Sequence, residues 1–279
     1  MKDFLRWIGQ TGLEKIVWMT DVDETLLEKC NDPNDVSHVP GLEYLCERLD
    51  KMAGGGFFVI TGRDLPWLDK VFPSKNIRAS CEYHCLFRKE PGMEPEALNP
   101  VPEWNRIDAE LDTLAASHQG LLLRKKHFMR SLHYIAVPEN ERAALKAKLE
   151  PELQKLLDRH NAETGQIVGM VDGGKVFDMG PSDSDKGHAL IEIMAAAEKL
   201  AGKNLIPIYF GDSSGDVPAA RAVQQNGGKF IAIGTDENVT SIADFKFKDP
   251  AEYRAAIKAL IDPVPAHKAH PPATGPKSP

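Results

Sequence analysis

Four short, mainly apolar runs constrain the fold of this 279-residue chain more than any other feature. They lie at residues 16–20, 57–60, 205–210 and 229–233. Helical patterns lie between or after them, at about 41–52, 186–201 and 217–225. Apolar strands that alternate with helices predict a parallel sheet covered on both faces. We therefore predict an α/β fold for the parts of the chain that contain these runs.

The middle of the chain has a different pattern. It combines two helical stretches with several short strands that favour antiparallel pairing. The helices are expected at about 103–118 and 139–160, and two of the strands at 121–126 and 131–137. This pattern predicts a compact α+β unit that interrupts the parallel sheet.

These patterns predict three parts. Residues 1–77 and 179–262 would form the core domain, and residues 78–178 an inserted domain. The end of the chain, 263–279, is rich in proline and lacks apolar anchors, so we expect it to be disordered.

Composition limits the partners and the compartment. The formal net charge of −7 gives no electrostatic reason to expect nucleic acid or an anionic membrane as a partner. The first residues lack the apolar core of a signal peptide, and four cysteines are too few for a disulfide scaffold. We expect a cytoplasmic protein with reduced thiols. The spacing of Cys81 and Cys85 leaves structural zinc as a less favoured alternative.

The strongest chemical signal is the pair Asp21 and Asp23 directly after the first apolar run. Open parallel sheets bind ligands at the carboxyl ends of their strands, so both carboxylates are expected to point into a crevice. An ionised aspartate can attack phosphorus, and a second one can donate a proton to the leaving oxygen. The alternative is an acidic turn that only ends the strand.

Three further groups of polar residues lie at the ends of apolar runs or at the start of a helix, and two of them could bind phosphate. Thr61, Gly62 and Arg63 follow the second apolar run, where a hydroxyl and backbone amides can hold phosphate oxygens. Lys186 opens a helix, and its ammonium adds to the positive helix terminus. Each of these alone could be a plain turn or a surface lysine.

Asp212 and Asp216 form the fourth group, in a Gly/Ser-rich loop after the third apolar run. Carboxylates in such a loop suit a hard cation with oxygen ligands, and Mg²⁺ is the expected one. The four groups together, in this chain order, predict phosphoryl chemistry.

The order D-x-D-x-T, T-G-R, Lys, G-D-x-x-x-D resembles the motifs of the haloacid dehalogenase superfamily of phosphatases. The place of the insertion resembles the C2-type cap of that superfamily. Within it, residues 126–134 and 175–187 are similar to segments of trehalose-6-phosphate phosphatases. The resemblance implies a Rossmann-like core with an α+β cap.

The resemblance also implies roles for the motif residues. Asp21 would be the nucleophile and Asp23 the general acid and base, while Thr61 and Lys186 would bind the phosphoryl group. Asp21, the backbone carbonyl of Asp23, and Asp212 would coordinate Mg²⁺, with Asp216 assisting directly or through water.

Substrate recognition is expected in the inserted domain and beside the T-G-R motif. The candidate substrate-binding residues are Gly62, Arg63, Glu82, Arg124, Lys126, His133 and Asp178. Three positions depart from the sugar phosphatase pattern: Tyr83 replaces a glycine, Arg124 a glutamate, and Asp178 a longer acid. Arg124, Lys125 and Lys126 could meet a second negative charge on the substrate, or could form a solvated basic face.

The sequence thus predicts a Mg²⁺-dependent phosphomonoester hydrolase for a small phosphorylated metabolite, such as trehalose 6-phosphate or a related sugar phosphate. A phosphomutase could use the same aspartates. A non-catalytic sugar-phosphate-binding regulatory protein is the alternative outside enzymes, and the presence of all four acidic residues disfavours it.

Overall fold

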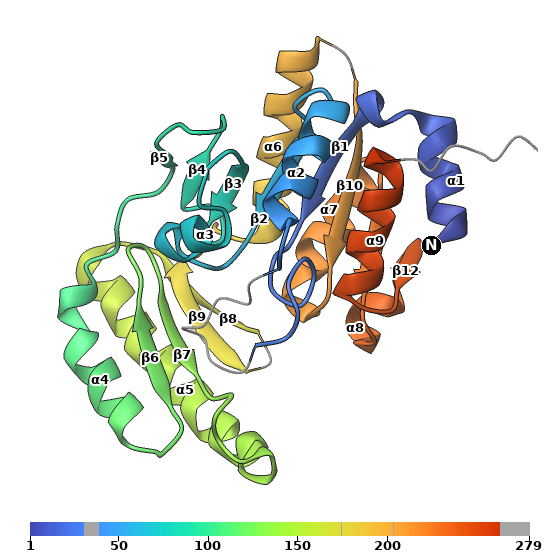
Figure 1. Ribbon diagram of the computed structural model, residues 1–279. Coiled ribbons are helices and arrows are strands. Elements are labelled where there is room, and N and C mark those ends of the chain that lie inside the picture. Colours follow the sequence, from blue (N-terminus) through green and yellow to red (C-terminus); the bar gives the residue numbers. More distant parts are fainter. Residues whose placement is uncertain (31–38, 174, 203, 263–279) are drawn as a thin grey trace, which may run out of the picture.

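The computed structural model describes residues 1–30, 39–173, 175–202 and 204–262. It contains two sheets, and the larger has eight strands in the order β12-β11-β10-β1-β2-β3-β4-β5 (Figure 1). They are β1 (Ile16–Thr20), β2 (Phe57–Ile60), β3 (Arg78–Cys81), β4 (Leu86–Arg88), β5 (Glu96–Ala97), β10 (Ile206–Gly211), β11 (Lys229–Ile233) and β12 (Phe245–Phe247). Neighbours from β12 to β3 pair in parallel, whereas β4 and β5 pair antiparallel. The predicted parallel core is confirmed.

Helices cover both faces of this sheet, as the alternation in β1 requires. Ile16 and Trp18 pack into one apolar core with residues of α1, α2, α3 and α9. Val17 and Met19 pack into the other with residues of α6, α7 and α8. The helices are α1 (Lys2–Thr11), α2 (Leu42–Met52), α3 (Leu65–Val71), α6 (Lys186–Ala201), α7 (Val217–Gln225), α8 (Glu237–Thr240) and α9 (Pro250–Ile261).

Several of these helices begin at an aspartate that caps a backbone amide, which explains where they start. The capping residues are Asp64 before α3, Asp185 before α6, Asp236 before α8 and Asp249 before α9.

The smaller sheet has four antiparallel strands in the order β6-β7-β9-β8. Its elements are α4 (Asp108–Ala116), β6 (Leu122–Lys125), β7 (Arg130–His133), α5 (Glu139–Thr164), β8 (Val168–Asp172) and β9 (Val176–Pro181). Leucines of α5, from Leu145 to Leu157, pack with Leu132 and Phe177 of the sheet into a separate apolar core. The predicted α+β unit, inserted between β5 and α6, is confirmed.

The two sheets divide the chain differently from our expectation for residues 78–97. We expected these residues in the inserted unit, but β3, β4 and β5 extend the large sheet. The strand β9 also continues to Pro181 within the small sheet. A short buried strand looks the same in either sheet, so its sequence does not indicate which one it joins. The domain limits at 78 and 178 stay a prediction, and the predicted disorder of 263–279 lies outside the described residues.

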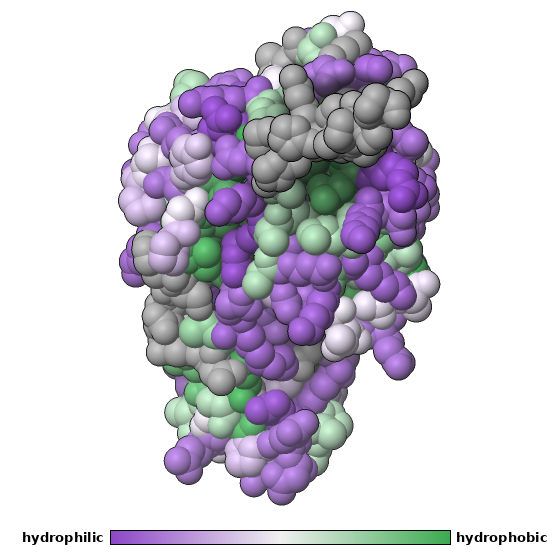
Figure 2. Space-filling model, turned by 45° about the vertical axis from the view of Figure 1, so that its right-hand side comes forward, coloured by the Kyte–Doolittle hydropathy of each residue, from purple (hydrophilic) through white to green (hydrophobic). Residues whose placement is uncertain are grey.

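The face of the molecule drawn in Figure 2 is mainly polar. On the face in Figure 2 hydrophilic side chains predominate, and hydrophobic ones appear in small patches between them. Within the described residues, no helix combines the length and apolar character needed to cross a bilayer.

The docking of α1 on the large sheet can be tested at Phe4. Its ring contacts Trp18, Phe210, Phe245 and Phe247 edge-on at centroid distances of 5.8, 5.8, 5.6 and 5.4 Å. Phe4→Ala should lower the free energy of unfolding by about 3–5 kcal/mol, measured by urea denaturation. The control Arg6→Ala, at an exposed position of α1, should change it by less than about 0.5 kcal/mol. If both substitutions change the free energy of unfolding by equally small amounts, α1 contributes little to the core.

Candidate active site

The large sheet brings three of the predicted motifs to one edge. β1 lies between β10 and β2, with Thr20 opposite both Phe210 and Val59. Asp21 follows β1 directly, and its amide donates to the Phe210 carbonyl at 2.9 Å. Asp212 follows β10, and Thr61 follows β2. The parallel register therefore places these side chains at adjacent strand ends.

Lys186 joins them from the first turn of α6. The Asp185 side chain caps this helix by accepting from the amides of Gly187 and His188. The Lys186 amine lies 3.0 Å from Asp21 Oδ1 and 2.7 Å from Asp216 Oδ1. Burial alone would lower its pKa, but the two carboxylates raise the pKa above that of a free lysine, so the amine stays protonated.

Asp216 is fully buried and holds the loop after β10 together. Its Oδ2 accepts from the amides of Asp212 and Ser213 at 3.0 and 3.1 Å. Its Oδ1 accepts from the Tyr209 hydroxyl at 2.5 Å as well as from Lys186. Gly211 is required here, because a Cβ atom at this position would lie 2.4 Å from Asp216 Cγ.

Asp21, Asp212 and Asp216 form a carboxylate cluster that could hold a metal ion. Each offers an oxygen, and these oxygens lie within 4.8 Å of one another. Burial raises the pKa of Asp21 to about 7, and it raises the pKa of Asp212 well above its usual value, with Asp216 adding repulsion in both cases. Such a cluster is costly to ionise without a cation, and an oxygen-only donor set fits a hard divalent ion.

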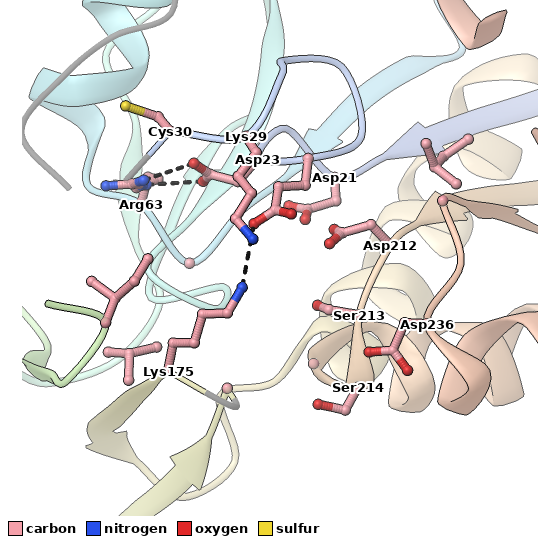
Figure 3. A pocket seen from close by; sticks show the side chains of 18 of the residues that line it. Asp21, Asp23, Lys29, Cys30, Arg63, Lys175, Asp212, Ser213, Ser214 and Asp236 are labelled. Carbon is pink, nitrogen blue, oxygen red and sulfur yellow. Dashed lines mark hydrogen bonds and ion pairs between the residues drawn. The ribbon is translucent and has the colours of Figure 1, made fainter. Parts of the chain in front are cut away.

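Asp23 lies on the other side of Asp21 and is held by Arg63. The guanidinium donates from Nε to Oδ2 at 2.9 Å and from Nη2 to Oδ1 at 2.7 Å. Arg63 also stacks on the Trp67 ring, with Cζ 4.5 Å from its centroid. This two-point pair fixes the direction of the Asp23 carboxylate (Figure 3).

A cavity of about 790 Å³ lies between the large sheet and the inserted unit. Among its lining residues are most of the predicted site residues: Asp21, Asp23, Gly62, Arg63, Arg124, Lys126, His133, Asp178, Lys186 and Asp212. Thr61, Glu82 and Asp216 are buried behind this lining. The Thr61 hydroxyl accepts from the Arg63 amide at 3.1 Å, and Glu82 accepts from the Phe128 amide at 2.9 Å.

Tyr83 connects the two sheets across this cavity. Its ring lies against Gly62, where a Cβ atom would come within 2.8 Å, and its hydroxyl donates to Asp178 at 2.8 Å. Glu82, Tyr83 and His84 all have positive φ, at 47°, 53° and 78°. Left-handed backbone is costly for residues other than glycine, so a strained turn holds Tyr83 in place.

Asp178 is committed to contacts within the protein. It accepts from the hydroxyls of Tyr83 and Ser131, and the Lys126 amine lies 3.6 Å away. Burial would raise its pKa, but Lys126 and the two hydroxyls lower the pKa overall, so Asp178 stays ionised. Lys126 also donates to the Gly62 carbonyl at 2.8 Å, which ties the small sheet to the T-G-R turn.

His133 and Arg124 lie on neighbouring strands of the small sheet and line the cavity. Burial and the nearby cations together lower the pKa of His133 to about 4, against the attraction of Asp178. His133 is therefore a neutral group at physiological pH.

The cysteines are separate from the carboxylate cluster. Cys81 and Cys85 are free and buried, and neither belongs to a group of potential ligands among the described residues. Burial raises the pKa of both thiols, that of Cys85 to about 11, so both are protonated.

Comparison with known proteins agrees with this geometry. No family model matches the chain. The chain is 28% identical over 233 residues to a probable trehalose-phosphate phosphatase of Sinorhizobium fredii, with 84% of this chain and 83% of that protein covered. The chain thus resembles a trehalose-phosphate phosphatase in sequence and haloacid dehalogenase-like hydrolases in fold.

Solved structures show the same fold. The C-terminal domain of C. albicans trehalose-6-phosphate phosphatase has a TM-score of 0.76 and 16% identity, covering 93% of this chain and 96% of that one. A haloacid dehalogenase-like hydrolase from B. subtilis has a TM-score of 0.59 and 14% identity, covering 90% and 100%. The trehalose-phosphate phosphatase branch is thus the part of the superfamily that the chain resembles.

Some residues of the site were not expected from the sequence. Tyr209 carries no motif, since it is one of several aromatic residues in an apolar strand, and its contact with Asp216 depends on the loop geometry. Thr25 is the conspicuous threonine of D-x-D-x-T, and its hydroxyl donates to Asp212 at 3.2 Å. That motif could have suggested a role for Thr25.

The carboxylate cluster makes the effect of Mg²⁺ on stability depend on pH. Asp21 and Asp212 have raised pKa values in the folded state against about 3.9 in the unfolded chain. Without metal, their contribution to stability is therefore lost as pH rises toward 7, whereas a cation binds the ionised form. The increase in the free energy of unfolding caused by Mg²⁺ should be larger at about pH 8 than at about pH 5.

Urea denaturation with Mg²⁺ or with chelator at each pH measures this increase. Asp212→Asn should reduce it at both pH values, because one charged ligand is lost. An increase that is the same at both pH values in the unmodified protein would contradict the assignment of the metal to this cluster.

Proposed function

We propose that the chain is a Mg²⁺-dependent phosphomonoester hydrolase that acts through an aspartyl-phosphate on Asp21. The observation that carries this proposal is the buried contact between Asp21 and Lys186 at the end of β1. A carboxylate nucleophile and a phosphate dianion repel each other, so the reaction requires fixed positive charge beside both. Lys186 provides that charge at the floor of a cavity large enough for a small metabolite.

Asp21 and Lys186 would act first. The Asp21 carboxylate attacks phosphorus and forms a bond to it as the ester oxygen leaves. The Lys186 ammonium holds a phosphoryl oxygen, and the Thr61 hydroxyl at the end of β2 helps to orient the same group. Asp216 keeps Lys186 aimed at this point by accepting one of its protons in a hydrogen bond.

Asp23 would move protons. It donates one to the leaving oxygen and later takes one from the water that cleaves the aspartyl-phosphate. Its pair with Arg63 holds the carboxylate to one side of Asp21. We infer that substrate binding must loosen this pair before Asp23 can carry a proton.

Asp21, Asp212 and Asp216 would hold Mg²⁺ together with the backbone carbonyl of Asp23. The bound ion would offset the negative charge of the phosphate and the carboxylates. The full set of acidic residues around Lys186 supports an enzyme over a regulatory protein that only binds sugar phosphates.

The substrate would be a small phosphorylated metabolite, and a sugar phosphate such as trehalose 6-phosphate is the class that the Sinorhizobium fredii relative suggests. The departures at Tyr83, Arg124 and Asp178 favour a related compound. Tyr83 and Asp178 bond to each other, whereas Arg124 faces the cavity. Recognition of the leaving group would therefore rest on Arg124, His133 and their neighbours.

Asp21→Asn tests the nucleophile. The change is nearly isosteric and removes the attacking charge, so turnover should fall by at least about 10³-fold while the folded structure is retained. Phosphate release from an aryl phosphate measures turnover, and circular dichroism checks the fold. Asp236→Asn is the matched control, because Asp236 lines the same cavity and asparagine can still cap α8. Similar activity of both variants would rule out Asp21 as the nucleophile.

Arg124→Ala and Lys126→Ala test recognition. Lys126 anchors the small sheet to Gly62 and Asp178, so its loss should lower kcat/KM on sugar phosphates and aryl phosphate alike. Loss of Arg124 should raise KM about tenfold for the preferred metabolite and leave the aryl phosphate nearly unchanged. Steady-state kinetics on both substrates decides this. If Arg124→Ala lowers kcat/KM equally for the metabolite and the aryl phosphate, Arg124 stabilises the cap and does not recognise the leaving group.

A further inference from the structure

Two lysine amines face each other at the rim of the cavity, one from each region of the molecule. Lys29 comes from the segment after β1, and Lys175 directly precedes β9 of the small sheet. Figure 3 shows the two side chains extended toward each other, with their amines in hydrogen-bond contact beside Asp21 and Asp23. Two ammonium groups repel at this distance, so the contact is unfavourable unless one loses its proton or an anion lies between them.

A third cation stands next to this pair. Arg142 lines a side chamber of about 350 Å³ together with Lys29 and Lys175, and both lysines also line the main cavity. Arg142 donates to the backbone carbonyls of Val137 and Ile135 at 2.8 and 2.6 Å, which fix the guanidinium without neutralising it. The chamber is therefore a positively charged extension of the cavity that holds the carboxylate cluster.

Within the part of the chain that the structure describes, the chamber is lined by three cationic side chains and no carboxylate. Glu24 lies 4.0 Å from the Lys175 amine, at the limit of an ion pair. Burial lowers the pKa of Lys175, the Lys29 amine and Arg142 lower it further, and Glu24 raises it. An anion placed between the two amines would remove this repulsion.

We propose that Lys29 and Lys175 bind a second anionic group of the substrate, a carboxylate, sulfate or phosphate on the part of the molecule that leaves. The inference rests on the proposed function, since it specifies the substrate class of the same site. The substrate would then be a phosphate monoester with two separate anionic groups. Its phosphoryl group would lie at Asp21 and Lys186, and its second anion would join the large sheet to the small one.

Binding of matched ligand pairs tests this site directly. Alkylphosphonates and phosphonocarboxylates of equal, graded chain length differ only in the terminal carboxylate. Isothermal titration calorimetry with Mg²⁺ present should show, for at least one length, about tenfold or more tighter binding of the carboxylated member. Lys29→Met and Lys175→Met should each remove most of that gain. Lys248→Met, at another lining position of the cavity, should retain it.

Two results would overturn the proposal. One is the absence of any gain from the carboxylate at every chain length, and the other is a gain that survives in both lysine variants. A free anion is the other source of the same chemistry. If sulfate binds beside an alkylphosphonate in a Lys175-dependent way while the carboxylated ligands gain nothing, the site holds a free anion and not the substrate.

The proposed function fails independently of this site. Calorimetry needs no turnover, so a carboxylate gain that depends on Lys29 and Lys175 would stand even if Asp21→Asn left the release of phosphate intact. If the carboxylate gives no gain in affinity but hydrolysis of an aryl phosphate is normal and depends on Asp21, only the proposed anion site is rejected.

Discussion

The buried ammonium of Lys186 between Asp21 and Asp216 is the interaction on which the rest of the site depends. A buried charge is costly unless it is paired, and removal of one partner leaves the others uncompensated. These two ion pairs join the end of β1, the start of α6 and the loop after β10. They fix three elements that lie far apart in the sequence around one point at the sheet edge, and they leave the Asp21 carboxylate with one face toward the cavity.

The chemical part of the site could be predicted from the sequence because parallel strands bring their ends together. Apolar runs before Asp21, Thr61 and Asp212 gave both the strands and the position of the polar residues that follow them. Contacts between the two regions could not be predicted in this way. The bond from Tyr83 to Asp178 depends on a strained turn at positions 82–84, and no periodic pattern indicates positive φ at residues other than glycine.

The residues expected to carry out the chemistry and those expected to recognise the substrate also differ in how firmly the protein holds them. Side chains near the cluster have several partners each, so their positions are fixed before a substrate binds. The cap side of the cavity combines Asp178 and Lys126, which bond within the protein, with Arg124, which lines the cavity. The Lys29–Lys175 pair lines the same cavity, with one lysine from each region of the molecule. The sheet membership of β3 to β5 also matters here, because it attaches the turn with Tyr83 to the large sheet and lets it form one wall of the site.

The covalent role of Asp21 is the central claim, and the stereochemical course at phosphorus tests it most directly. A phosphorothioate monoester made chiral with one heavy oxygen isotope can be hydrolysed in water that carries another, and the configuration of the thiophosphate read by phosphorus NMR. Attack by Asp21 followed by attack of water makes two in-line displacements, so the account predicts net retention of configuration. Net inversion would mean that water attacks the ester directly, and would contradict an aspartyl-phosphate on Asp21.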